Sequence, residues 1–340
     1  MVIEQYTVTT PTYNFPQPSI DTILPQRFLE QSLYSLKQVT RNPHHLNQQN
    51  FQQYPSTLQL KPEPIPLKPN HQETIIAAVD TSTVKIGETR TGIIVAIRGA
   101  TTWRQNRAYR YTRLGPFVFH ITEENKNQVY NALEKAYFTT SYAISHQATP
   151  NLMQMPTRLA SLLEHWLQTM LAKTVNNGIL LFDGSLTAGT IDTPVQRLKE
   201  ILSYARRNNT TVLAFSKATT LRANGFLITD QLPNQDPPYL LETTGLASKL
   251  PLVLLGDVYV ARLNKANIAF RLDIDRETEF SQRLEAIQKL LGNDLYKQCY
   301  PETLRLSHIL CTFTANEVLA MQHFITRKHG IQIINRPDMH

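Results

Sequence analysis

The pattern of apolar residues changes near residue 73 and divides the chain into two regions. From Glu73 onward, short continuous apolar runs alternate with stretches whose apolar residues recur at helical spacing. The runs predict strands over 74–79, 91–98, 108–112, 178–182, 211–215, 252–263 and 268–274, with a turn over 85–89 and a loop over 229–251. The helical spacing predicts helices over 123–139, 156–173, 194–208 and 277–291. A capping box of Thr314 and Glu317 predicts the start of a last helix, to about Arg327.

The order of these elements indicates the fold class. The first three strands follow one another as a hairpin meander, and strands then alternate with helices in the middle of the chain. Such an order is typical of an α/β fold with a sheet of mixed direction, flanked by helices.

Residues 1–72 have a different composition, rich in proline and glutamine. One stretch, 26–39, has apolar residues at helical spacing and predicts a short helix. Alternating prolines such as those of KPEPIPLKP favour an extended polyproline II linker, because proline cannot continue a helix. We therefore predict an N-terminal extension over 1–72 and one folded domain over 73–340.

Composition limits the kinds of partner, the cellular location and the kinds of cysteine site that we expect. The formal net charge of +7 favours an anionic partner. No apolar run is long enough to span a membrane and no secretory signal is visible, so we expect a cytoplasmic protein. The two cysteines, Cys299 and Cys311, are not close enough for a CxxC motif and too few for a disulfide framework or a zinc site.

Two aspartates follow apolar strands and are candidates for a metal site. Asp80 follows the run IIAAV and Asp183 follows ILLF, each before small or hydroxyl residues. If the two strands are neighbours, the carboxylates lie side by side and their repulsion favours a divalent cation or a shared proton. An aspartate after a strand is also a common turn former, so either one alone is weak support.

Two further residues have an ordinary structural interpretation beside the functional one. Glu164 lies beside the apolar stripe of the helix over 156–173, where a solvated glutamate is common. His308 lies in the largely apolar segment YPETLRLSHILC, where a satisfied core histidine is more common than a ligand.

The order and spacing of these motifs, over about residues 73–328, resemble the NurA domain family of prokaryotic nucleases. The matching pieces are Val79-Asp80-Thr81-Ser82, Arg158 with Glu164, Phe182-Asp183-Gly184-Ser185-Leu186, Ser216-Lys217, Phe270-Arg271-Leu272-Asp273, and Tyr300-Pro301 with Leu304 and His308. The resemblance implies an RNase H-like fold, a homodimer and a manganese-dependent nuclease that works with a HerA-type hexameric ATPase. It implies cleavage of single-stranded DNA and 5′ to 3′ degradation of duplex ends.

By the same resemblance, the active site consists of Asp80, Glu164, Asp183 and His308. Two Mn²⁺ or Mg²⁺ ions would activate water and relieve charge on the phosphate, and an imidazole ligand favours manganese. Lys217 is a candidate for steadying the departing phosphate. One departure from the family is Thr81, which stands where the family usually has glycine.

A basic segment between Lys85 and Arg113 is a candidate DNA-binding surface. Arginines can bind phosphates while interleaved aromatic rings stack on bases. We expect the two tyrosines of 109–113 on one strand face and its two arginines on the other; the alternative is a basic edge strand that prevents unwanted pairing. The candidate DNA-binding residues are Arg104, Arg107, Tyr109, Arg110, Tyr111, Arg113 and Lys217.

Two other functions compete with a nuclease. An actin-like ATPase also begins with a strand that ends in aspartate, but it needs a second glycine-rich phosphate turn, and FDGSLTAGT lacks that spacing. A non-catalytic subunit that binds DNA or docks to a translocase would have kept the fold, and Thr81 is its only support.

Overall fold

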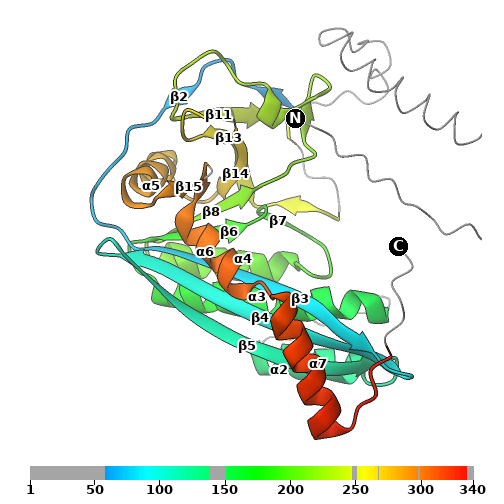
Figure 1. Cartoon of the computed structure of the whole chain (residues 1–340). Coiled ribbons are helices and arrows are strands. Elements are labelled where there is room, and N and C mark those ends of the chain that lie inside the picture. The colour runs from blue at the N-terminus through cyan, green and yellow to red at the C-terminus, as the bar shows by residue number, and fades with distance from the viewer. Residues whose placement is uncertain (1–57, 138–150, 247–250, 267, 298, 335–340) are drawn as a thin grey trace, which may run out of the picture. The chain divides into compact units, whose positions relative to one another are not determined.

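The computed structural model describes residues 58–137, 151–246, 251–266, 268–297 and 299–334 (Figure 1). The predicted helix over 26–39 lies outside these ranges. None of the helices within them is both long and apolar enough to cross a membrane.

Five strands form the centre of the sheet in the order β5-β4-β3-β6-β8. The strands β3 (Ile76–Glu88), β4 (Gly92–Gln105) and β5 (Ala108–Thr122) are antiparallel. The strands β6 (Ile179–Asp183) and β8 (Thr211–Ser216) continue the sheet parallel to β3. Three antiparallel strands followed by two parallel ones, with helices on both faces, confirm the mixed α/β sheet that the sequence predicted and form the RNase H-like sheet that the resemblance implied.

Five more strands widen the sheet beyond β8. The strands β14 (Phe270–Asp275), β13 (Gly256–Arg262) and β11 (Tyr239–Thr244) follow in antiparallel pairs. The prediction of a loop over 229–251 is wrong for β11, because Pro237 and Pro238 precede this strand rather than interrupt it. Two short strands from the predicted linker, β1 (Gln59–Leu60) and β2 (Ile65–Pro66), pair with β11.

The opening hairpin is longer than predicted. The prediction of a turn over 85–89 is wrong, because β3 continues to Glu88 through an irregularity between Lys85 and Gly87. The apolar signal fades after Val79, since the buried apolar residue in the second half of β3 is Ile86, which belongs to a small cluster with Ile325 and the partly buried Met321 and Ile333. Asp80 therefore lies within β3 and not at its end.

Helices cover both faces of the sheet (Figure 1). One face carries α2 (Lys126–Tyr137), α3 (Met155–Thr174) and α4 (Val195–Arg207). The other carries α5 (Phe280–Asn293), α6 (Glu302–Cys311) and α7 (Ala315–His329). The remaining short elements are η2 (Leu152–Gln154), η3 (Ile228–Asp230), β7 (Thr187–Ala188), β9 (Arg222–Ala223), β10 (Phe226–Leu227), β12 (Val253–Leu254), β15 (Tyr296–Lys297) and β16 (Tyr300–Pro301).

Alternate residues of β3 belong to two separate cores. Ala77 and Val79 pack with the apolar residues of α3 and α4, whereas Ile76 and Ala78 pack with those of α5 and α6. Successive strand residues point to opposite faces, so a strand buried on both faces must be apolar at every position. This explains the continuous run IIAAV that precedes Asp80.

The start of α7 is tied to the sheet through Glu317. Its carboxylate accepts hydrogen bonds from the buried Arg98 at 2.8 Å and from Arg113 at 3.0 Å. It also completes the predicted capping box with Thr314, which the structure confirms. Arg98, the largest cause, and the backbone of Thr314 lower the pKa of Glu317 to about 2. This junction fixes where α6 ends and α7 begins.

Replacing Glu317 with glutamine should destabilise the protein by about 2 kcal/mol, because the buried guanidinium of Arg98 loses its counter-charge, while glutamine can keep the capping box. Since the folded pKa is lowered, the contribution of Glu317 is complete above pH 4.5 and is lost as the pH falls toward 2. Urea unfolding at pH 7 and pH 3 measures both effects. Glu285→Gln, which removes a carboxylate from a surface pair with Lys289, should change stability by less than about 0.5 kcal/mol.

Candidate functional site

The predicted neighbourhood of Asp80 and Asp183 exists because β3 and β6 are adjacent parallel strands. Their pairing ends at Val79 and Phe182, so each aspartate is the next residue after the last pair. Beyond Val79, the edge of β3 that pairs with β6 has no hydrogen-bonded partner residue in β6. The negative charge of Asp183 contributes to raising the pKa of Asp80, which places the two carboxylates within electrostatic reach.

Asp80 is held by hydrogen bonds at both carboxylate oxygens. Its Oδ1 accepts from the backbone N–H of Thr81 at 2.7 Å, and its Oδ2 lies 2.7 Å from Nδ1 of His308. Burial is the largest cause that raises the pKa of Asp80, and the contact with His308 opposes it. The side chain of His308 is 54% exposed, so this residue is not the buried core histidine that its apolar segment favoured.

Glu164 reaches the same region from α3, on the opposite face of β3. Its Oε2 accepts from the hydroxyl of Thr81 at 3.2 Å and its Oε1 from Gln168 at 3.1 Å. Burial, and next the charge of Asp80, raise the pKa of Glu164 to about 8. This carboxyl group therefore does not behave as a solvated surface glutamate.

Thr81 supports the acidic residues instead of displacing them. Its backbone N–H donates to Asp80 and its hydroxyl donates to Glu164. Because the side chains of Asp80 and Thr81 point to opposite faces of β3, this single residue connects the α6 side of the site to the α3 side. A glycine here could make only the backbone contact.

Asp183 has a basic partner and an aromatic neighbour. Its Oδ2 accepts from Nζ of Lys217 at 2.7 Å, and this ammonium lies 5.1 Å from the ring centre of Tyr300. Burial, and next the charge of Asp183, raise the pKa of Tyr300. Tyr300 belongs to a matched motif, but nothing in that motif predicts that its side chain lies beside Asp183.

The loop that follows Asp183 is fixed by backbone hydrogen bonds. Gly184 has a φ of +115°, a conformation that favours glycine; its N–H donates to Phe215, and its carbonyl accepts from the hydroxyl of Ser216 at 2.7 Å. The fully buried Asp273 accepts from the N–H of Leu186 at 2.9 Å. The motifs around these residues therefore position Asp183.

Cys311 completes a group that the sequence did not indicate. Its thiol, one oxygen of Asp80 and one nitrogen of His308 all lie within 4.8 Å of one another. Burial and the charge of Asp80 raise the pKa of Cys311. The available signal was the spacing of His308 and Cys311, three residues apart on one helix face.

The donor set fits a divalent cation. Burial disfavours the charges of Asp80 and Glu164, and both carboxyl groups have raised pKa values that a bound cation would reverse. Carboxylate oxygens with one imidazole suit Mn²⁺ or Mg²⁺. Within the described residues, the group of three that could hold an ion is formed by Asp80, His308 and Cys311, while Glu164 and Asp183 act on it through their charges.

The candidate DNA-binding strand β5 lies at one edge of the sheet, with Arg107, Arg110 and Tyr111 exposed. The expectation that its two arginines share a face is wrong for Arg113, which lies four residues after Tyr109 and therefore on the face of the tyrosines. Arg113 binds Glu317, and the hydroxyl of Tyr109 donates to Asp294 at 2.6 Å. Arg104 lies 5.7 Å from the ring centre of Tyr109.

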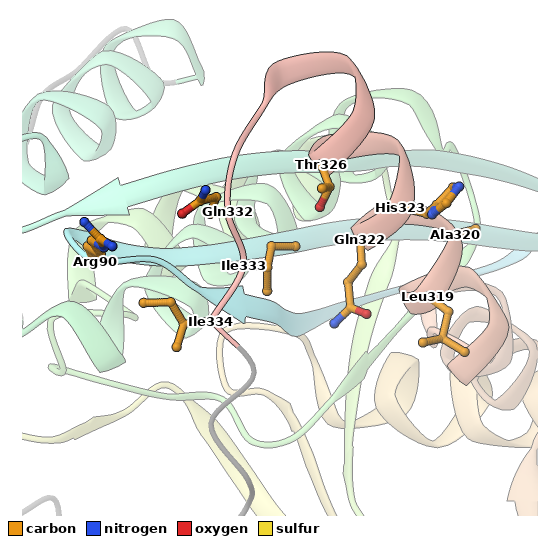
Figure 2. Close-up of a pocket in the computed structure, with 9 residues that line it drawn as sticks. All are labelled: Arg90, Leu319, Ala320, Gln322, His323, Thr326, Gln332, Ile333 and Ile334. Carbon is orange, nitrogen blue, oxygen red and sulfur yellow. The ribbon is translucent and has the colours of Figure 1, made fainter.

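A hollow of about 970 Å³ lies away from the acidic residues, between α7, Arg90 and the segment Gln332–Ile334 (Figure 2). Figure 2 shows Gln322 and Leu319 projecting from α7 at its rim. None of the residues that line this hollow belongs to the candidate site.

Comparison with solved structures finds matches over most of the chain. The NurA nuclease from Sulfolobus solfataricus matches with a TM-score of 0.49 and 11% identity, over 91% of this chain and 98% of that one. The chain is similar to NurA. Endonuclease V from Bacillus subtilis matches with a TM-score of 0.35 and 11% identity, over 78% of this chain and 89% of that one. No protein-family profile and no curated protein sequence matches the chain.

Endonuclease V from Ciona intestinalis, solved with a DNA that contains inosine, matches with a TM-score of 0.35 and 9% identity, over 76% of this chain and 92% of that one. At such low identities, function has to be inferred from the site residues themselves.

Replacing Glu164 with glutamine should stabilise the metal-free protein at pH 8.5 by a few °C in Tm. With a pKa near 8 in the folded state and 4.5 ordinarily, this carboxyl opposes folding increasingly as the pH rises from about 4.5 to 8. The variant should lack that part of the pH dependence.

Thermal unfolding in EDTA from pH 5 to 9 measures this effect. Glu63→Gln, at an exposed position, is the control for removing a charge. A Glu164→Gln variant that melts below the wild type throughout would show that the ionised carboxylate stabilises the fold.

Proposed function

We propose that this protein is a divalent-metal-dependent DNA nuclease whose active site consists of Asp80, Glu164, Asp183 and His308. The observation that carries this proposal is the arrangement around β3: Thr81 joins Asp80 to Glu164 of α3, Asp80 contacts His308 of α6, and Asp183 ends the adjacent parallel strand β6. Carboxylates that repel one another are typical of sites where a bound cation compensates their negative charge. Their position on the two central parallel strands and a facing helix supports the same conclusion.

The three carboxylates and His308 would hold the metal ions. Bound divalent ions supply an activated water and neutralise charge on the phosphate and on the leaving oxygen. Asp80 is central to the set, because Thr81 and His308 fix both of its oxygens. Glu164 is oriented by Thr81 and Gln168, so its carboxylate is placed before any ion binds.

His308 is suited to transferring a proton, and Lys217 is suited to neutralising negative charge. His308 is half exposed and contacts Asp80 through Nδ1, so its Nε2 can carry a proton to or from solvent. Lys217 neutralises Asp183, and its ammonium is 45% exposed. We infer that Lys217 moves from Asp183 to the scissile phosphate when an ion takes its place.

The substrate and partners follow from the surface and from the sequence resemblance. Exposed arginines and Tyr111 on β5 support binding of single-stranded DNA or of frayed duplex ends. Single-strand endonuclease and 5′ to 3′ exonuclease activity, a homodimer, a HerA-type hexameric ATPase as partner and a cytoplasmic location rest on the resemblance alone. They complete the proposal of a DNA end-resection or repair nuclease.

A non-catalytic DNA-binding subunit was the alternative that Thr81 supported. The hydrogen bonds of Thr81 to Asp80 and Glu164 remove that support, since this residue helps to hold the two carboxylates. The nuclease is therefore the better proposal.

Asp80→Asn and Asp183→Asn should each reduce Mn²⁺-dependent cleavage of end-labelled single-stranded DNA by at least about 100-fold, because each removes a charged metal ligand. Reactions with Mn²⁺, Mg²⁺ or EDTA, on 5′- and 3′-labelled strands, give the metal requirement and the polarity. Asp236→Asn, an exposed aspartate in a loop, is the matched control and should cleave at the wild-type rate. Undiminished cleavage by either site variant, with unchanged Mn²⁺ binding in calorimetry, would reject the site.

Replacing Arg107 and Arg110 together with glutamine should weaken binding of single-stranded DNA. The negative slope of log K against log salt concentration should become shallower by up to about 1.4, the value expected for two phosphate contacts on single-stranded DNA. Arg113→Gln should change this slope less, because Arg113 is already paired with Glu317. Fluorescence anisotropy at several salt concentrations tests this, and a slope equal to that of the wild type would mean that DNA does not contact this strand.

A further inference from the structure

The thiol of Cys311 lies beside two of the proposed metal ligands but plays no part in the proposed reaction. Cys311 and His308 are three residues apart in α6 and share one helix face, while Asp80 projects toward them from β3. Their ligand atoms lie within 4.8 Å of one another. The group therefore offers one oxygen, one nitrogen and one sulfur ligand.

This combination of ligands suits a different class of metal ion from the one that the nuclease would use. Mg²⁺ and Mn²⁺ prefer oxygen ligands, whereas Zn²⁺, Co²⁺ and Cd²⁺ also bind imidazole and thiolate. Three protein ligands with one position left for water is a common arrangement for zinc. The cysteine count predicted no zinc site, but one cysteine is enough where an aspartate and a histidine supply the other ligands.

The three residues are held in place before an ion arrives. Leu304 of α6 is fully buried in the core that α6 shares with β3, so the helix cannot shift easily along the strand. Cys311 is fully buried, whereas the side chain of Asp80 is 12% exposed and that of His308 is 54% exposed. An ion from solvent would thus contact His308 and Asp80 first, with the sulfur behind them.

We propose that Asp80, His308 and Cys311 form a site for Zn²⁺ and other thiophilic divalent ions, and that its occupation inhibits the nuclease. Binding releases the thiol proton as the metal–sulfur bond forms. Inhibition follows because the ion withdraws Asp80 and His308 from the proposed active site. The metal site stands on this geometry alone, while the inhibition rests on the proposed function.

Titrating Co²⁺ into the metal-free full-length protein tests the site without an activity assay. A bond between Co²⁺ and a thiolate gives a charge-transfer band in the near ultraviolet. The chain has two cysteines, both buried, so Cys299→Ser is a matched control for Cys311→Ser. We expect the band in the wild type and in Cys299→Ser, its loss in Cys311→Ser, and its displacement by Zn²⁺.

No band in wild-type protein that calorimetry shows to be loaded with Co²⁺ would overturn the proposal. A band that disappears with Cys299→Ser would also overturn it. If Cys311→Ser does not fold, as its melting temperature without metal would show, the band in Cys299→Ser still assigns the bond to Cys311, the one cysteine left.

Zn²⁺ added to a Mn²⁺-dependent cleavage reaction tests the inhibition. Cys311→Ala should need at least about tenfold more Zn²⁺ than the wild type for half-inhibition, since even a lost outer partner of a metal site costs 10–100-fold in affinity. Equal sensitivity of the two proteins would overturn the inhibitory role. A Co²⁺–thiolate band in a protein that does not cleave DNA with any metal ion would reject the proposed nuclease function but support the metal site. Cleavage by a protein that shows no such band would support the nuclease function but reject the metal site.

Discussion

The placement of two poorly solvated carboxyl groups, Asp80 and Glu164, on the two sides of the central strand β3 is the constraint on which the candidate site depends. Asp80 and Asp183 stand on neighbouring parallel strands, and Glu164 approaches from the helix on the other face. The charges are unfavourable there, as the raised pKa values of Asp80 and Glu164 show. They are kept together because the two cores on either side of β3 fix the backbone that carries them.

The residues of the β3 strand change from apolar to polar after Val79, and the candidate site lies at that change. Up to Val79 it is covered by β6 and by helices on both faces, so every side chain is apolar. After Val79 the pairing with β6 has ended, and polar side chains can point to either face. Asp80 then faces α6 and Thr81 faces α3, which brings His308 and Glu164, 144 residues apart, to one strand.

The α6 helix adds an imidazole and a thiol to the carboxylates of the candidate site. It carries His308, which suits a manganese site, and Cys311, which does not belong to one. Its C-terminal end is fixed through Arg98, which donates to the carbonyl of Thr312 and to Glu317 in α7. One short helix therefore presents both an imidazole and a thiol to the same carboxylate, so the groups that lie next to Asp80 depend on how α6 is positioned.

The sequence by itself determined the α/β fold class and the positions of α2, α3, α4, α5 and α7, and it singled out Asp80 and Asp183 at the ends of apolar runs; it did not predict the helix α6, which carries His308 and Cys311. Continuous apolar runs mark strands that are buried on both faces, and the amphipathic helices follow from their 3.6-residue period. Periodicity could not find β11, where prolines precede the strand, or the polar second half of β3, whose buried Ile86 belongs to a small cluster with Ile325. The roles of Thr81, Tyr300 and Cys311 were decided only by the tertiary structure, because each depends on a contact between elements distant in the chain. The local sequence indicates which side chains of a segment face the core, whereas candidate site residues from a strand and two helices come together only when the sheet has formed.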